Sequence, residues 1–270
     1  MHRSLLFVPG NRPDRYAKAC ATRADAVIVD LEDAVAPVDK ANARKSLVAA
    51  LHGGMRVMVR VNATGSEWFR DDLRACAHES VLAIVLPKAE RADDIAEVAS
   101  VCGERPVLPL VETALGLWNA LDIARARNVK ALLFGALDFQ ADLGASDEDL
   151  FHARSQLVLV SRVAGIAAPI DGITQAVHDT ELLRRDCLRA RRLGFGGKLC
   201  IHPKQVDIVN ACFSPSPEEV AWARRVVEAF AQSAGNAALL DDRMIDRPVL
   251  TRAQAILAQA DETQGDSRAV

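Results

Sequence analysis

Residues 26–61 read AVIVDLEDAVAPVDKANARKSLVAALHGGMRVMVRV. Two apolar runs, 26–31 and 57–61, enclose a segment, 39–51, whose apolar residues recur at three- and four-residue spacing. Such spacing is typical of an amphipathic helix. The two runs show little alternation of polar and apolar residues, as expected of strands buried on both faces of a parallel sheet. The segment is therefore predicted to be a strand–helix–strand unit.

The same alternation continues through most of the chain. Eight apolar runs are found, at residues 5–8, 26–31, 57–61, 82–86, 107–111, 131–134, 167–170 and 198–201. Further helix-like segments are 92–101, 115–126, 150–164 and 180–193. This pattern predicts a closed (β/α)8 TIM barrel. A doubly wound open sheet is the alternative, but the G-x-G-x-x-G loop that often marks its first turn is absent.

Two more helices are expected after the eighth strand, at 218–234 and 248–260. We therefore expect a barrel domain over residues 1–235. The tail, 236–270, has the character of an assembly element and is expected to pack on a neighbouring subunit.

Composition excludes several classes of partner. The 270 residues include 33 basic and 36 acidic side chains, a net charge of -3, which does not favour nucleic acid. The apolar stretch near the N-terminus, 5–8, is too short for a signal peptide or membrane span, so we expect a cytoplasmic protein without a membrane partner. The six cysteines lack the spacing of zinc or redox motifs.

Ionisable residues follow the apolar runs, where a barrel carries its chemistry. Glu112 and Asp138 lie at neighbouring strand ends. Carboxylates without thiolates favour magnesium, with manganese as the alternative, and magnesium typically takes one or two protein carboxylates. Each could instead cap the following helix, and Asp142 could serve in place of Asp138.

Arg60, between valines at the end of the third run, could hold a substrate carboxylate at two points. The alternative is a buried ion pair with Asp30 or Glu32, and both can hold if the pair orients the arginine. Gly135 and Ala136 could lend backbone N–H groups to a second carboxylate or oxyanion.

Two other residues are weaker candidates. His202 is as readily a structural residue as a general base. Lys88 could form a Schiff base, but the carboxylate pair would then need a separate explanation.

The chain resembles the citrate lyase beta-subunit-like (HpcH/HpaI aldolase/citrate lyase) family. The resemblance rests on an ordered set of segments that covers almost the whole chain: RSLLFVPGNRPDRYAKA (3–19), DAVIVDLEDAV (25–35), KANAR (40–44), VRVNATG (59–65), VLPKAE (85–90), LVETALGLWNALDIA (110–124), LLFGALDFQADLG (132–144), PIDGI (169–173), GFGGKLCIHPKQV (194–206) and MIDRPVL (244–250).

This resemblance implies a magnesium-binding barrel, trimeric or built from trimers, such as a hexamer. It implies that Glu112 and Asp138 hold the metal and that Arg60 binds the substrate carboxylate. It further implies that Asp246 enters a neighbouring subunit's site. Members act on citryl-, malyl-, citramalyl- or methylmalyl-coenzyme A thioesters, and true citrate lyase subunits act with an acyl-carrier partner.

The expected reaction is therefore a magnesium-dependent retro-Claisen or retro-aldol cleavage, or its reverse, of a small hydroxyacyl-coenzyme A. The candidates for proton transfer are Asp30, Glu32, Asp33 and Asp246. Coenzyme A phosphates could meet the basic residues Arg12, Arg15 and Lys18, which a solvated helix face explains equally well.

Three alternatives stay open: a class II pyruvate-type aldolase that does not use coenzyme A, a non-catalytic acyl-thioester-binding protein, and a thioesterase side activity.

Overall fold

The computed structural model describes residues 2–145, 150–233, 237–241 and 243–266. The chain forms two compact units, Met1–Asn210 and Ala211–Val270. The division lies within the helix Pro203–Phe213, ahead of the long helix that the sequence assigned to the barrel domain.

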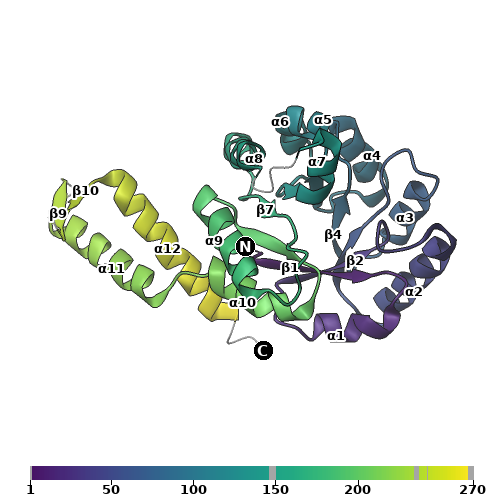
Figure 1. Cartoon of the computed structure of the whole chain (residues 1–270), viewed down its shortest axis with the longest axis horizontal. Coiled ribbons are helices and arrows are strands. Elements are labelled where there is room, and N and C mark those ends of the chain that lie inside the picture. Colours follow the sequence, from purple (N-terminus) through teal and green to yellow (C-terminus); the bar gives the residue numbers. More distant parts are fainter. Residues whose placement is uncertain (1, 146–149, 234–236, 242, 267–270) are drawn as a thin grey trace. The chain divides into compact units, whose positions relative to one another are not determined.

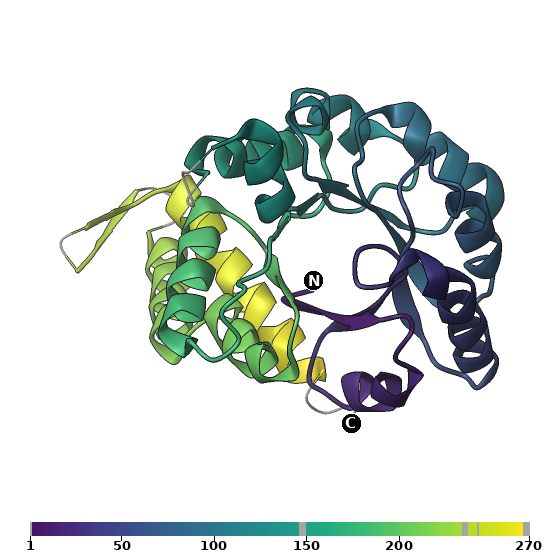
Figure 2. The same ribbon diagram turned by 45° about the vertical axis from the view of Figure 1, so that its right-hand side comes forward.

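The first unit is a closed barrel of eight parallel strands that pair in chain order, and β8 returns to pair with β1 (Figures 1 and 2). The strands are β1 (Ser4–Pro9), β2 (Ala26–Asp30), β3 (Val57–Arg60), β4 (Val81–Leu86), β5 (Val107–Val111), β6 (Leu133–Phe134), β7 (Ile170–Asp171) and β8 (Gly197–Cys200). The predicted (β/α)8 barrel is thus confirmed, and the open-sheet alternative is wrong because β1 and β8 close the ring.

Helices alternate with the strands on the outside of the ring (Figure 2). They are α1 (Tyr16–Cys20), α2 (Lys40–His52), α3 (Phe69–Ala75), α4 (Ala92–Cys102), α5 (Ala114–Trp118), α6 (Ala120–Arg125), α7 (Ala136–Leu143), α8 (Phe151–Ala164), α9 (Thr180–Leu193) and α10 (Pro203–Phe213), with 3-10 turns η1 (Pro13–Arg15) and η2 (Pro37–Asp39). The segment predicted as one helix at 115–126 is two short helices, α5 and α6, which meet at Asn119.

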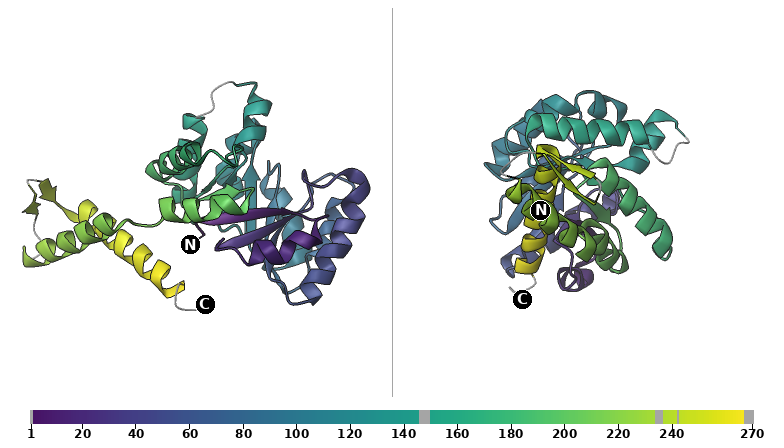
Figure 3. Two further views of the ribbon diagram at one scale, coloured as in Figure 1. Left: turned by 60° about the horizontal axis from the view of Figure 1, so that its bottom comes forward. Right: turned by 90° about the vertical axis from the view of Figure 1, so that its left-hand side faces the viewer.

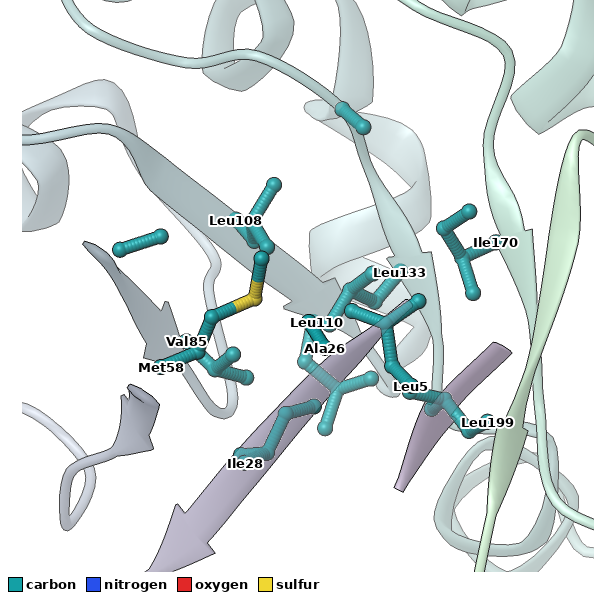
Figure 4. Close-up of a cluster of buried hydrophobic side chains, with 12 residues drawn as sticks. Leu5, Ala26, Ile28, Met58, Val85, Leu108, Leu110, Leu133, Ile170 and Leu199 are labelled. Carbon is teal, nitrogen blue, oxygen red and sulfur yellow. The ribbon is translucent and has the colours of Figure 1, made fainter. Parts of the chain in front are cut away.

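The barrel interior is filled by apolar side chains from all eight strands, among them Ile28, Met58, Leu110 and Leu199 (Figure 4). Because side chains alternate along a strand, the neighbour of Leu199 in β8, Lys198, points to the helix layer instead. Closure of the ring needs a residue without a side chain at Gly197, since a Cβ there would lie 2.4 Å from the His2 carbonyl oxygen.

The second unit contains α11 (Pro217–Gln232), a hairpin of β9 (Ala238–Leu240) and β10 (Arg243–Ile245), and α12 (Arg247–Asp266). The two helices run side by side (Figure 3). Their small core contains Ala223, Val226, Ile245 and Ala253. The predicted extra C-terminal helices are therefore present. None of the helices that the structure describes is long and apolar enough to cross a membrane.

Candidate active site

A cavity of about 440 Å³ opens at the carboxyl ends of the barrel strands. Its polar lining includes Asp30, Arg60, Glu112 and Asp138, which come from four different strand ends. Apolar side chains complete the wall: Phe7, Leu110, Phe134, Leu137, Ile173, Leu199 and Ile201. The cavity therefore brings together the metal-ligand and carboxylate-binding candidates that the sequence predicted.

Arg60 is fixed by Asp30 at the end of the neighbouring strand. Its Nε and Nη2 atoms each donate to a different Asp30 carboxylate oxygen, both at 2.7 Å. The same two oxygens also accept the backbone N–H groups of Glu32 and Ala34, at 2.9 and 3.2 Å. Burial lowers the pKa of Arg60, but its pairing with Asp30 outweighs this effect and the net pKa is raised. Both Asp30 oxygens therefore accept hydrogen bonds that hold Arg60 in its orientation.

Glu32 lies between two cations. Its Oε1 is 2.5 Å from Lys88 Nζ, and its Oε2 is 3.1 Å from Arg60 Nη1. Burial raises the pKa of Glu32, and the charges of Arg60 and Lys88 oppose that rise. The ion-pair alternative for Arg60 therefore describes its contacts with both acids, and its Nη1 also lies 3.6 Å from the Asp33 carboxylate, which lines the same cavity. These contacts leave the second Nη2 hydrogen unused.

Glu112 carries a carboxylate oxygen that its surroundings leave unused. The residue is 1 % exposed. Oε1 accepts the backbone N–H of Lys88 at 2.7 Å, whereas the buried Oε2 has no hydrogen-bond partner among the described residues. Burial, reinforced by the charges of Glu32 and Asp138, raises the pKa of Glu112 to about 8.

Two backbone features shape the surroundings of Glu112. A Cβ at Gly135 would lie 2.4 Å from Glu112 Cβ and 2.5 Å from its Oε2, so only glycine fits there. Lys88 has a left-handed φ of 48°, which is costly for a residue with a side chain. This conformation directs its amide to Glu112 while its ammonium pairs with Glu32.

Asp138 is exposed in the first turn of α7 and lines the cavity. It is not the capping residue, because Gly135 occupies that position. Asp142 accepts the Ala114 N–H at 2.7 Å and is not part of the cavity wall, so Asp138 is the better-placed acid.

The two backbone amides proposed as ligand donors differ in their contacts. The Gly135 N–H donates to the Val111 carbonyl oxygen at 3.0 Å and is unavailable to a ligand. The first bond of α7 joins Phe139 N to Gly135 O, so the Ala136 N–H has no acceptor within the helix.

These contacts fit a hard cation such as magnesium. Among the described residues, no group of three or more histidine, cysteine or acidic side chains is placed to bind a metal. Magnesium needs only one or two protein carboxylates and keeps oxygen ligands from water or substrate, whereas calcium takes six to eight oxygens. The unpartnered Oε2 of Glu112, with Asp138 on the next strand end, supplies such a pair.

Other candidates lie outside the cavity wall. Arg12 is exposed and paired with Asp14, and Lys18 is exposed on α1. Asp246 is in the second unit, where its Oδ1 accepts the Val249 N–H and caps α12. His202 accepts the Lys204 N–H at 3.1 Å, as in a structural turn.

Lys88 is a poor Schiff-base residue. Burial lowers the pKa of its ammonium, but the ion pair with Glu32 outweighs this and the net pKa is raised. The sequence analysis did not identify the double role of Lys88, or the apolar wall from Ile173 and Ile201, because neither position carries a distinctive sequence signal.

Comparisons with known proteins identify the family of this chain. Residues 3–203 match the model of the HpcH/HpaI aldolase/citrate lyase family, and residues 146–262 match that of the C-C bond lyase of the TIM-barrel fold. A citrate lyase subunit beta-like protein of Deinococcus radiodurans is 39 % identical, with 95 % of this chain and 96 % of the relative covered.

A (3S)-malyl-CoA thioesterase of Cereibacter sphaeroides is 36 % identical, with 96 % of this chain and 94 % of the relative covered. Among solved structures, protein CitE of Mycobacterium tuberculosis, in complex with magnesium, acetoacetate and coenzyme A, superposes with a TM-score of 0.86. That structure is 37 % identical, and the match covers 96 % of this chain and 98 % of the other.

Proposed function

We propose that this chain, which belongs to the HpcH/HpaI aldolase/citrate lyase family, is a carbon–carbon lyase that cleaves or forms a small hydroxyacyl-coenzyme A thioester with magnesium. The substrate would be of the citryl-, malyl- or citramalyl-coenzyme A type, and the products an oxo acid and an acyl-coenzyme A. The observation that carries the proposal is the buried, unpartnered Oε2 of Glu112 in the cavity lined by Asp138 and Arg60.

Glu112 and Asp138 would hold the magnesium ion. The bound ion would act as a Lewis acid toward the carboxylate and hydroxyl oxygens of the hydroxy acid. Ionisation of Glu112 is opposed by burial and by nearby carboxylates, so a cation at this position would relieve an unfavourable charge. The relative that carries magnesium in its crystal structure supports this assignment.

Arg60 would bind the substrate carboxylate through hydrogens on its Nη1 and Nη2 atoms. Asp30 would hold the guanidinium plane, so the substrate meets a preoriented donor pair. The Ala136 N–H at the start of α7 would donate to a second substrate oxygen.

Cleavage requires two proton transfers. The substrate hydroxyl loses its proton to a base, the carbon–carbon bond breaks, and its electron pair forms the thioester enolate. An acid then protonates the enolate carbon. Asp30 is unsuited to either task because both of its oxygens are occupied. We assign the transfers to Glu32, whose pKa is raised and whose buried Oε2 has no hydrogen-bond partner among the described residues, and to Asp246 of a second subunit.

Asp246 would act from a second subunit if the enzyme is a homo-oligomer, a trimer or hexamer, whose second unit packs on a neighbour. Arg12 and Lys18 would contact the phosphates of coenzyme A, since both are exposed and basic. Coenzyme A bound to the Mycobacterium tuberculosis structure supports its use as part of the substrate.

A thioesterase is the second candidate function. It is favoured by the 36 % identity to proteins named (3S)-malyl-CoA thioesterase. A thioesterase would attack the thioester carbonyl with water and release the coenzyme A thiol. A lyase would leave the thioester bond intact.

One experiment separates these functions. The purified protein would be given magnesium and citryl-, malyl-, citramalyl- and methylmalyl-coenzyme A, beside free hydroxy-oxo acids, and both oxo-acid release and free thiol release would be recorded. We expect oxo acid without thiol from one thioester. This activity should be lost on chelation and in Glu112→Gln, but kept in Glu79→Gln, a matched change at an exposed glutamate. Thiol release alone would make the protein a thioesterase, and turnover of free acids alone a pyruvate-type aldolase.

A further inference from the structure

A second cavity, larger than the candidate active site, lies beside α9. Its volume is about 800 Å³, which is within the range of small-molecule sites. It shares three lining residues, Ala136, Leu137 and Ile173, with the active-site cavity, so the two openings adjoin. We call it the arginine groove.

The arginine groove has a positive lining. Five cationic side chains contribute to it: Arg154, Arg185, Arg189, Arg192 and Lys198. Among the residues that the structure describes, one carboxylate, Asp186, also lines the groove, and Asp171 pairs with Arg154 and Lys198. Positive charge in a concave surface with low-dielectric walls concentrates the field and attracts anions.

Buried cations form part of this lining. Arg154 is 3 % exposed and Lys198 is 1 % exposed. They share one carboxylate, that of Asp171, at 2.9 and 3.4 Å, and Lys198 also donates to the Gly172 carbonyl oxygen.

The outer wall carries arginines from one face of α9. Arg185 and Arg192 are exposed and form no ion pair with any residue that the structure describes. They are seven positions apart in the sequence, so their Cα atoms lie about 10 Å apart along the helix axis. A favourable interaction with the helix dipole explains an arginine in the last turn, Arg192, but not Arg185 in the middle of the helix.

We propose that the arginine groove binds a small molecule that carries two separated phosphate groups. Arginine presents a planar set of donors that matches phosphate oxygens. The distance between Arg185 and Arg192 favours two separated anionic groups over one compact group. Gln140, Thr174 and Gln175 add polar groups to the wall. The groove lacks the carboxylate pair of the active site, so this binding does not require the magnesium ion.

The test measures binding of adenosine 3′,5′-bisphosphate by isothermal titration calorimetry to the full-length protein. A chelator is present, so that no metal bridges the ligand to the active-site acids. AMP, with a single phosphate, is the comparison ligand. We expect one bisphosphate per chain, bound about tenfold or more tightly than AMP. Equal affinities for the two ligands would contradict the requirement for separated phosphates.

Two matched variants locate the binding. The double variant Arg185→Gln/Arg192→Gln should weaken it about tenfold or more. Arg184→Gln, an exposed arginine of the same helix outside the groove lining, should leave the affinity unchanged. No binding, no loss in the double variant, or an equal loss in Arg184→Gln would each overturn the proposal. Glu112→Gln should retain binding, so failure of the lyase assignment would not affect this result.

Coenzyme A then identifies the source of the phosphates. If coenzyme A displaces the bisphosphate and also binds more weakly to the double variant, the groove, rather than Arg12 and Lys18, takes the nucleotide end of the thioester. If it does not displace the bisphosphate, the groove takes a separate phosphorylated ligand. Either result supports the site, provided that the double variant has lost bisphosphate affinity.

Discussion

Relative to the wild type, the metal-free Glu112→Gln variant should gain stability as the pH rises. Glu112 is 1 % exposed and its pKa is raised from the ordinary 4.5 to about 8, mainly by burial. The folded protein therefore keeps this proton up to about pH 8. The unfolded chain, by contrast, releases it near its ordinary pKa.

The sign of the effect follows from proton binding. Between the two pKa values the folded state binds more protons than the unfolded state, so the stabilising contribution is present at low pH and is lost as the pH rises. A shift from 4.5 to about 8 corresponds to about 5 kcal/mol in total. Between pH 5 and pH 8 the wild type should lose about 3 kcal/mol that the glutamine variant keeps.

The glutamine amide also has a cost. Its nitrogen would replace the unpartnered Oε2 and become a buried donor without an acceptor, which costs about 1 to 3 kcal/mol. This cost does not depend on pH. The change in the stability difference with pH therefore tests the argument, rather than the difference at any single pH.

Urea unfolding of the wild type and Glu112→Gln, in chelator at half-unit steps from pH 5 to pH 8, would measure this change. Groups common to both proteins cancel in the difference, and Glu79→Gln controls for loss of a carboxylate at an exposed site. In melting temperature the effect corresponds to about 6 to 12 °C. A stability difference that stays constant across the range would refute a neutral, buried Glu112.

Three further predictions concern the neighbours of the site and the helix layer. Lys88→Gly should be more stable in urea than Lys88→Ala by about 1 kcal/mol, because φ at this position is 48°; equal stability would mean that the backbone relaxes. Asp30→Asn should lower kcat/KM about 100-fold on the thioester identified in the turnover screen by releasing Arg60, and an unchanged KM would show that other contacts hold the arginine. Asp171→Asn should lower the free energy of unfolding by about 3 to 5 kcal/mol, because it removes the buried carboxylate that Arg154 and Lys198 share. The pKa of Asp171 is lowered by Lys198 and Arg154 against the effect of burial, so the advantage of the wild type over Asp171→Asn should shrink as the pH falls through the acid range.

The barrel could be predicted because its strands are buried on both faces. Runs such as 26–31 and 107–111 therefore stand out from the amphipathic helices that follow them. The positions of Glu112, Asp138 and Arg60 could be predicted for the same reason, since each follows a strand in a fold that carries its chemistry at strand ends.

The use made of each polar atom could not be predicted. Nothing in the sequence indicates that the Gly135 amide completes the sheet by donating to Val111 while Ala136 begins a helix. Asp30 accepts from the backbone two and four residues ahead because the chain turns tightly after β2, and that turn depends on tertiary packing. The break of the predicted helix at Asn119 also depends on a tertiary contact. The Asn119 side chain donates to the Glu90 carbonyl oxygen at 2.9 Å, in the loop after β4.

The contribution of Asp246 from a second subunit can be tested by complementation. The Glu112→Gln chain lacks the barrel carboxylate and keeps Asp246 in its tail, whereas the Asp246→Asn chain keeps Glu112 and lacks the tail carboxylate. If the tail serves a neighbouring barrel, mixing the two inactive proteins and allowing subunits to exchange should create sites with both residues. For random mixing, about a quarter of the sites would be complete, so activity should return to about a quarter of the wild-type value.

The opposite arrangement gives a different result. If Asp246 served its own barrel, no mixed oligomer would contain a complete site, because each chain lacks one of the two residues. The mixture would then stay as inactive as its components. Asp246→Asn keeps a side-chain oxygen that can accept the Val249 N–H, so the cap of α12 is retained and the loss of activity reports on the missing carboxylate. Restored activity in the mixture, absent from either protein alone, would require both the oligomer and the exchange of Asp246 between subunits.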